Sequence, residues 1–243
     1  MMASKDSRRF LIERGCDLMQ GLFKEKMAEL RAYFETLEGL IKEAESNDIF
    51  GLQERAQKLP ETRRGAFWQW EYPYYWEQVF VPTLRSSFIA WAFAILEDCL
   101  DTVCTQSGIV AGIDRNWTKL DRSRIKSAQK FLSELVGFDE PAKEAWDKVG
   151  NLYRIRNKLV HEGGRIKPKN SKESLEVESF VQATKGISIS SIWTDDQITN
   201  DFPGQIEVDA DFCRYALDTL DEFVDALHAE QQALCNRFAT QLD

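Results

Sequence analysis

A long apolar stripe without proline constrains the fold of this chain more than any other feature. Between about Lys5 and Ser46, apolar side chains recur at three- and four-residue steps, the spacing of one face of an α-helix. These positions are Leu18, Phe23, Met27, Leu30, Phe34, Leu37 and Ile41. A helix with so long a stripe must pack on a helical bundle or on a second subunit.

Further helical segments complete such a bundle. The stretch from Trp76 to about Thr105 is apolar on almost every side, which is typical of a central helix. A last helix is expected from about Asp209 to Phe238, with Asp209 or Asp211 as its N-cap. Shorter helices are expected near Ile49 to Lys58, from Arg122 to Val136, and from Pro141 to about His161, where Gly163-Gly164 stops the last of them.

The remaining segments read as loops or strands. Trp68 to Trp76 is rich in aromatic residues and reads as an irregular connection, either a plug under a loop or a surface on which bases could stack. Gly108 to Asp121 is expected to be a loop and Arg165 to Lys185 a polar excursion. Gly186 to Trp193 alternates like a strand, and Gly204 to Val208 could pair with it.

These elements predict a mainly α fold. We expect an up-and-down helical bundle with long N- and C-terminal helices and a small β-hairpin insertion. In this interpretation residues 1–243 form one domain, whose core is about 76–164 plus the 209–238 helix. Residues 1–60 are then a helical extension, and residues 165–208 a polar, β-hairpin insertion.

The composition argues against several classes of protein. Lys5 to Arg14 carry charges without an apolar run between them, so no signal peptide is expected. The longest apolar run, Phe88 to Leu96, is about half as long as a membrane-spanning helix. The five cysteines show neither the paired spacing of a zinc site nor the density of a disulfide scaffold. We therefore expect a cytoplasmic protein without membrane contact, metal or cofactor.

The net charge of −9 is distributed unevenly. Residues 171–243 hold 15 acidic and 4 basic residues, a net of −11, which leaves +2 for residues 1–170. Twelve basic residues form two clusters, each of which could bind phosphate or could be an ordinary solvated helix face. The first is Arg115, Lys119, Arg122, Arg124, Lys126 and Lys130, and the second is Arg154, Arg156, Lys158, Arg165, Lys167 and Lys169.

Arg156 occupies an unusual place on its predicted helix. At 100° per residue it falls in the middle of the apolar arc, where an unpaired guanidinium would cost several kcal/mol. It should therefore meet a carboxylate such as Glu97 or Asp98, or face a cleft that admits a phosphate. A salt-bridged core arginine remains the plain alternative. His161 lies about 140° from Arg156 on an ideal helix, so both reach one phosphate only if the arginine curls round, the helix loosens, or a second subunit contributes.

The pattern Arg156-Asn157-x-x-x-His161 resembles the Arg-x(4 to 6)-His signature of the HEPN superfamily. The resemblance covers roughly Trp76 to Gly164 and includes an acidic residue on the preceding apolar helix, here Glu97. It implies a homodimeric, metal-independent endoribonuclease that uses the 2′-hydroxyl of RNA as nucleophile and leaves a 2′,3′-cyclic phosphate. It also suggests a toxin or antiviral effector, with an antitoxin or another protein as partner.

The expected site residues fall into three groups. Arg156, Asn157 and His161 are the candidate catalytic residues, because RNA cleavage asks for proton transfer and for cations at the phosphorane. The supporting carboxylates would be Glu97 and Asp98, and the expected substrate-binding residues are Arg154, Lys158, Arg165 and Lys167.

A second class of function stays open. The same residues could belong to a non-catalytic helical module that binds RNA, a nucleotide or a protein partner. The discriminating observation is whether Arg156 and His161 line an open cleft, since occlusion of both by Glu97 and packing would count against the enzyme.

Overall fold

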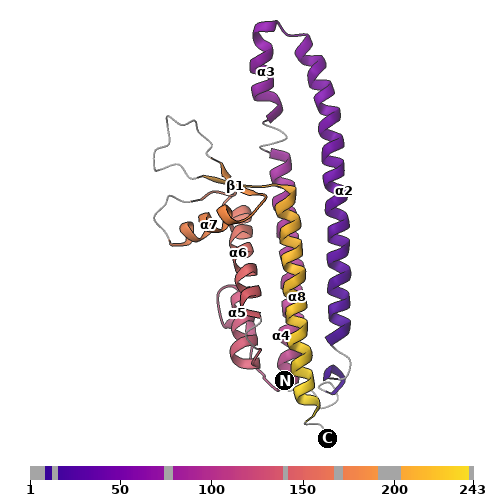
Figure 1. Ribbon diagram of the computed structural model, residues 1–243, viewed down its shortest axis with the longest axis vertical. Helices are drawn as coiled ribbons and strands as arrows, with labels where there is room; N and C mark the ends of the chain where they lie inside the picture. The colour runs from indigo at the N-terminus through magenta and orange to yellow at the C-terminus, as the bar shows by residue number, and fades with distance from the viewer. Residues whose placement is uncertain are drawn as a thin grey trace. The chain divides into compact units, whose positions relative to one another are not determined.

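The computed structural model describes residues 9–12, 16–73, 79–138, 142–166, 172–190 and 204–240. The described residues confirm the mainly α fold with one small β-hairpin (Figure 1). The helices are α2 (Cys16–Gln57), α3 (Glu61–Pro73), α4 (Val81–Ala111), α5 (Arg124–Lys130), α6 (Ala142–His161), α7 (Lys172–Ala183) and α8 (Ala210–Ala239). A 3₁₀ turn, η3 (Trp117–Lys119), precedes α5, and a π-helical turn, η4 (Phe131–Val136), follows it.

The chain divides into two compact units, and each of the helices α2, α4, α6 and α8 contributes to both. The first unit contains residues 1–29, 91–154 and 215–243, and the second contains residues 30–90 and 155–214. The predicted organisation as a single domain with an extension and an insertion stays a prediction.

Each unit has its own apolar core. In the first unit, Trp146 of α6 packs edge-on against Phe223 of α8, with ring centroids 4.6 Å apart. In the second, Phe34 of α2 packs against Phe88 of α4 at 4.5 Å. Phe34 belongs to the apolar stripe seen in the sequence, which is buried at Phe23, Met27, Leu30, Phe34 and Ile41.

Three helix predictions were wrong. The helix α2 runs to Gln57 without a break before Ile49, because no proline interrupts it and Leu52 and Ala56 continue its buried face. Residues 68–73 belong to α3, whereas 74–76 lie outside the described residues. The helix α4 continues past Thr105 to Ala111, since Ser107 and Val110 are buried.

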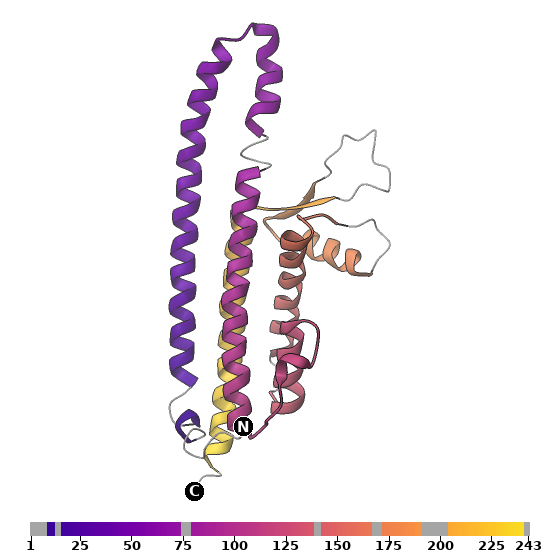
Figure 2. The same ribbon diagram turned by 180° about the vertical axis from the view of Figure 1, so that it is seen from behind.

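In the second unit, one helix and two strands follow α6 in the chain. The predicted polar excursion contains the helix α7, whose Val177 and Val181 are buried. The predicted hairpin is confirmed: β1 (Ile187–Ser190) pairs antiparallel with β2 (Gln205–Val208), with Ile187 opposite Val208. Seen from behind, α7 and the hairpin lie at the C-terminal end of α6 (Figure 2).

The structure shows which of the two expected aspartates caps the N-terminus of α8. The Asp209 carboxylate accepts a hydrogen bond from the Phe212 amide at 3.0 Å, and so satisfies a free donor of the first helical turn. Gly186 lies against this cap with φ of +81°, and a Cβ there would fall 2.4 Å from the Asp209 carboxylate. The hairpin and the start of α8 are thus held in one arrangement.

Within the described residues, no helix combines the length and the apolar character needed to cross a membrane.

Candidate active site

The residues of the HEPN-like motif lie on the last turns of α6, in the second unit. Ile155 and Leu159 anchor this segment, because both side chains are buried. Arg156 and Asn157 are half-buried, and His161, the last residue of the helix, is exposed. The motif therefore lies on the border between the apolar face of α6 and solvent.

The Arg156 guanidinium links the three residues. Its Nη1 donates to Asn157 Oδ1 at 2.9 Å and lies 3.4 Å from His161 Nε2. The angular separation on an ideal helix does not keep the two side chains apart, because the long arginine side chain reaches along the helix towards the histidine. One chain therefore brings all three candidate catalytic residues together.

The direction of this contact depends on the tautomer of the histidine. A guanidinium has donors only, so Arg156 Nη1 donates to His161 Nε2 only where that nitrogen carries its lone pair. In that tautomer the lone pair faces the guanidinium, so His161 can take a proton from a substrate only when Nη1 releases Nε2.

A double-glycine turn determines where α6 ends. Gly163 and Gly164 have φ of +60° and +76°, and the Gly164 amide donates to the Lys158 carbonyl at 2.9 Å. The Gly164 carbonyl then accepts from the Ile206 amide at 2.8 Å, and the Ile166 amide donates to the Gly204 carbonyl at 2.8 Å. Short antiparallel pairing with β2 thus fixes the chain that follows His161.

The four predicted substrate-binding residues have different surroundings. Lys158 is buried, and its Nζ pairs with Glu162 Oε1 at 2.8 Å. Arg154 is half-buried in the first unit and donates to Asn151 Oδ1 at 3.0 Å. Arg165 is exposed beside β2, and Lys167 lies outside the described residues.

The two predicted supporting carboxylates lie on α4, in the first unit. Asp98 is exposed and accepts a hydrogen bond from Lys26 Nζ at 2.9 Å. Glu97 is half-buried. Their role beside the motif stays a prediction.

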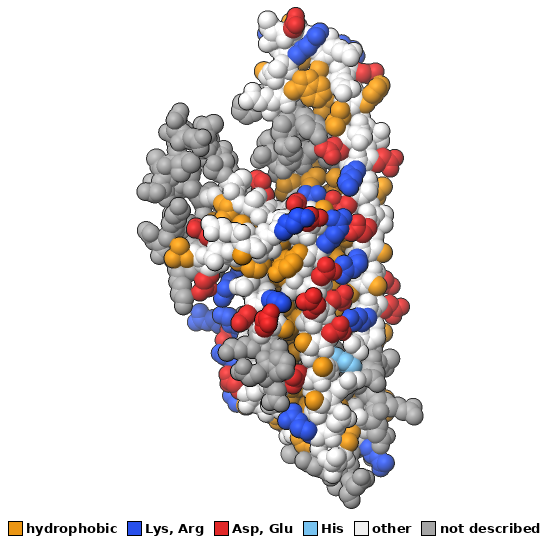
Figure 3. Space-filling model, viewed as in Figure 1, with side chains coloured by type: hydrophobic (Ala, Val, Ile, Leu, Met, Phe, Trp, Pro, Cys, Tyr) orange, Lys and Arg blue, Asp and Glu red, His pale blue; other side chains and the backbone are white. Residues whose placement is uncertain are grey.

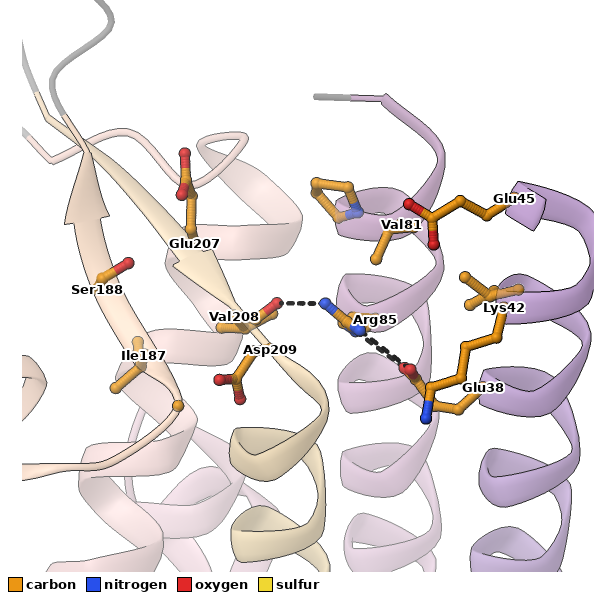
Figure 4. A pocket seen from close by; sticks show the side chains of 13 residues that line it. Glu38, Lys42, Glu45, Val81, Arg85, Ile187, Ser188, Glu207, Val208 and Asp209 are labelled. Atoms are coloured by element: carbon orange, nitrogen blue, oxygen red, sulfur yellow. Dashed lines mark hydrogen bonds and ion pairs between the residues drawn. The ribbon is translucent and has the colours of Figure 1, made fainter. Parts of the chain in front are cut away.

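A cavity of about 580 Å³ in the second unit was not anticipated from the sequence. Segments of α2, α4 and the hairpin line it (Figure 4). Arg85 binds both carboxylate oxygens of Glu38, at 2.9 and 3.0 Å, and its Nη1 lies 3.4 Å from the Val208 carbonyl. Burial lowers the pKa of Arg85, but the hydrogen bond and charge of Glu38 outweigh it and raise this pKa overall.

The sequence does contain a signal for this ion pair. Glu38 lies four residues after Phe34 and three before Ile41, so a helical reading places it on the buried stripe. Arg85 is the only charged residue of the sequence between Val81 and Leu96. On the face of the second unit seen in Figure 3, acidic and basic side chains are intermixed over the C-terminal part of α2.

The described thiols are not arranged as nucleophiles or ligands. Cys99, Cys104, Cys213 and Cys235 are free thiols, and burial raises the pKa of both Cys99 and Cys213 to about 12. No group of three or more Cys, His, Asp or Glu side chains in the described part of the chain is placed to hold a metal ion.

Comparison of the chain with protein-family models, with curated proteins and with solved structures found no match. The resemblance to the HEPN superfamily therefore stays a prediction from the motif residues.

Proposed function

We propose that this protein is a metal-independent endoribonuclease of the HEPN type. The observation that carries the proposal is the contact of Arg156 Nη1 with both Asn157 Oδ1 and His161 Nε2 at the exposed end of α6. A cation, a polar orienting group and a histidine that can transfer a proton, all within one hydrogen-bonded group, are the parts that phosphodiester cleavage by a 2′-hydroxyl requires.

In the proposed reaction His161 takes the proton from the 2′-hydroxyl. The 2′-oxygen then attacks phosphorus, and the bond from phosphorus to the 5′-oxygen breaks as the cyclic phosphate forms. Arg156 neutralises the charge that develops on the phosphorane, while Asn157 holds the guanidinium. The leaving 5′-oxygen needs a proton from an acid, which His161 of a second copy supplies in a homodimer.

The test is cleavage of end-labelled single-stranded RNA by purified protein in EDTA. Wild-type protein should release products with cyclic-phosphate ends, and His161→Ala should reduce the rate by about a hundredfold or more, the contribution typical of a general base. Arg156→Ala should also lose activity. His228→Gln, which alters the other histidine of the chain, controls for histidine loss as such.

A second substrate tests whether the 2′-hydroxyl is the nucleophile. RNA with 2′-O-methyl groups lacks the nucleophile and should stay intact. Cleavage of that RNA, or equal cleavage by His161→Ala and wild type, would show that the motif does not carry the activity.

The second candidate is a non-catalytic module that binds a nucleotide or a protein partner. The observation in its favour is that the cavity of about 580 Å³ in the same unit is lined by residues outside the motif. Folded wild-type protein that cuts no RNA under any condition, yet binds a nucleotide, would favour this candidate.

A further inference from the structure

The two basic clusters look equivalent in the sequence, but the structure separates them. Between residues 154 and 169, Lys158 is buried in an ion pair, and Arg154 and Arg156 donate to asparagine side chains. Three of the six cations of that cluster thus contact side chains on or just after α6. The cluster between residues 115 and 130 belongs to the first unit and has a different arrangement.

In this other cluster, two of the six cations are neutralised. Arg124 Nη2 pairs with Asp101 at 3.1 Å, and Lys130 Nζ pairs with Asp121 at 2.7 Å. The remaining four side chains are exposed, and within the described residues none of them makes a side-chain hydrogen bond or ion pair. These four, which we name the basic patch, are Arg115, Lys119, Arg122 and Lys126.

The segment beneath the basic patch is firmly held. Trp117 and Ile125 are buried, and the Arg124 guanidinium lies over the Trp117 ring at 5.5 Å. Asn116 Oδ1 accepts from the amide and the hydroxyl of Thr118. Ser127 Oγ accepts from the Asp121 amide at 2.7 Å and donates to the Asp121 carbonyl at 3.0 Å, which ties the turn before α5 to that helix.

The local charge is strongly positive for so acidic a protein. Residues 115–130 contain six basic residues and one acidic residue, a net of +5, against −9 for the whole chain. Including the flanking Asp114 and Glu134 leaves +3. Four exposed cations on a held backbone suit a partner with regularly spaced anionic groups, since contacts with phosphates gain free energy by releasing condensed counterions.

We propose that the basic patch is a docking surface for the sugar-phosphate backbone of single-stranded RNA. The choice of RNA as the polyanion rests on the proposed function, whereas the surface itself does not. Such contacts position a strand without reading its sequence, so binding should be insensitive to base identity and strongly dependent on salt.

The experiment measures binding of fluorescein-labelled 2′-O-methyl oligouridine, which cannot be cleaved by 2′-hydroxyl attack, by fluorescence anisotropy in EDTA. Four phosphate contacts on a single strand predict a slope of roughly −2.8 for log K against log salt concentration. The variant Lys119→Ala/Arg122→Ala/Lys126→Ala should make that slope shallower by about 2. It should also weaken binding by roughly tenfold or more at 50 mM salt.

A matched variant removes three exposed cations from the second unit that lie outside the lining of its cavity: Arg55→Ala/Lys58→Ala/Arg63→Ala. It has the same net charge as the patch variant and should leave the slope unchanged. Equal loss of binding in both variants would overturn the proposal, because net charge alone would then explain the effect. Unchanged binding in a folded patch variant would also overturn it.

Two further arms keep this proposal separate from the nuclease proposal. The variant His161→Ala should bind the uncleavable RNA as wild type does, so patch-dependent binding without any cleavage would support the docking surface and contradict only the enzyme. Polyglutamate is the test for an acidic protein as partner. Patch-dependent binding of polyglutamate with no binding of RNA would overturn the choice of RNA.

Discussion

Arg85 and Glu38 form a two-point ion pair in which Glu38 is 4% exposed and the Arg85 side chain is 18% exposed. Removing one partner of a buried pair leaves a charge without compensation, whereas replacing both by apolar residues is often neutral. The pair therefore predicts a specific pattern of stabilities.

We expect Arg85→Met to lower the free energy of unfolding by about 2–4 kcal/mol, because Glu38 then stays buried without its cation. The double variant Arg85→Met/Glu38→Met should recover most of this loss. Urea unfolding followed by circular dichroism measures both. If the double variant is as unstable as the single one, packing rather than charge accounts for the effect.

Two glycines of the α6 segment should respond to alanine in opposite directions. Gly164 has φ of +76°, and a Cβ there would lie 3.0 Å from the Ile206 carbonyl oxygen, so Gly164→Ala should destabilise the protein by about 1–3 kcal/mol. Gly150 lies inside α6 with open space around it, and Gly150→Ala should stabilise by up to about 1 kcal/mol. Thermal unfolding of both variants tests the pair. An equal shift of Tm in one direction would contradict it.

The turn before α5 should make the free energy of unfolding depend on pH in the acid range. A hydrogen bond from Lys130 and one from the Ser123 amide lower the pKa of Asp121 to about 2, so the folded state holds this carboxylate ionised more strongly than the unfolded state does. The contribution is complete above the ordinary aspartate pKa of about 4 and is lost as the pH falls towards 2. A series of Tm measurements from pH 5 to pH 2 should show a smaller acid-induced decrease for Asp121→Asn than for wild type. Parallel curves would mean that Asp121 does not contribute.

Asn157 should act through Arg156 rather than on the substrate directly. Asn157→Asp keeps an oxygen for the guanidinium and should retain RNA cleavage within about tenfold of wild type, whereas Asn157→Leu should lose about a hundredfold. If Asn157→Asp loses as much activity as Asn157→Leu, the residue does not act by holding the guanidinium. The readout is the rate of cleavage in EDTA as a function of RNA concentration.

Elements with a strong period were predictable from the sequence, and elements that depend on tertiary burial were not. The apolar stripe from Phe23 to Ile41 and the alternation of apolar and polar residues in β1 can each be read from one segment of the sequence alone. The reason is that the same spacing of apolar residues repeats along the whole segment. The end of α2 was misplaced because Ser46, Asn47 and Asp48 are poor helix formers, yet burial of Leu52 outweighs that preference. The helix α7 was missed because Glu176 and Glu178 flank Val177 and mask the helical spacing of Val177 and Val181, both of which are buried.

The sequence predicts the residues of the candidate site, whose role stays a prediction, but it did not predict their geometry. The motif spacing identified Arg156, Asn157 and His161, while a helical wheel describes Cα directions and not the reach of an arginine side chain. Burial of Lys158 could not be foreseen, because a lysine beside a solvent-facing glutamate ordinarily extends into water.

The pairing of Gly164 and Ile166 with β2 joins segments roughly forty residues apart in the chain. The amide protons of Ile166 and Ile206 should therefore exchange with solvent together and more slowly than those of the exposed turn at Gly163. In folding, the last turn of α6 gains its final restraint only after the hairpin has formed, so the orientation of His161 is among the later features of the native state to be established.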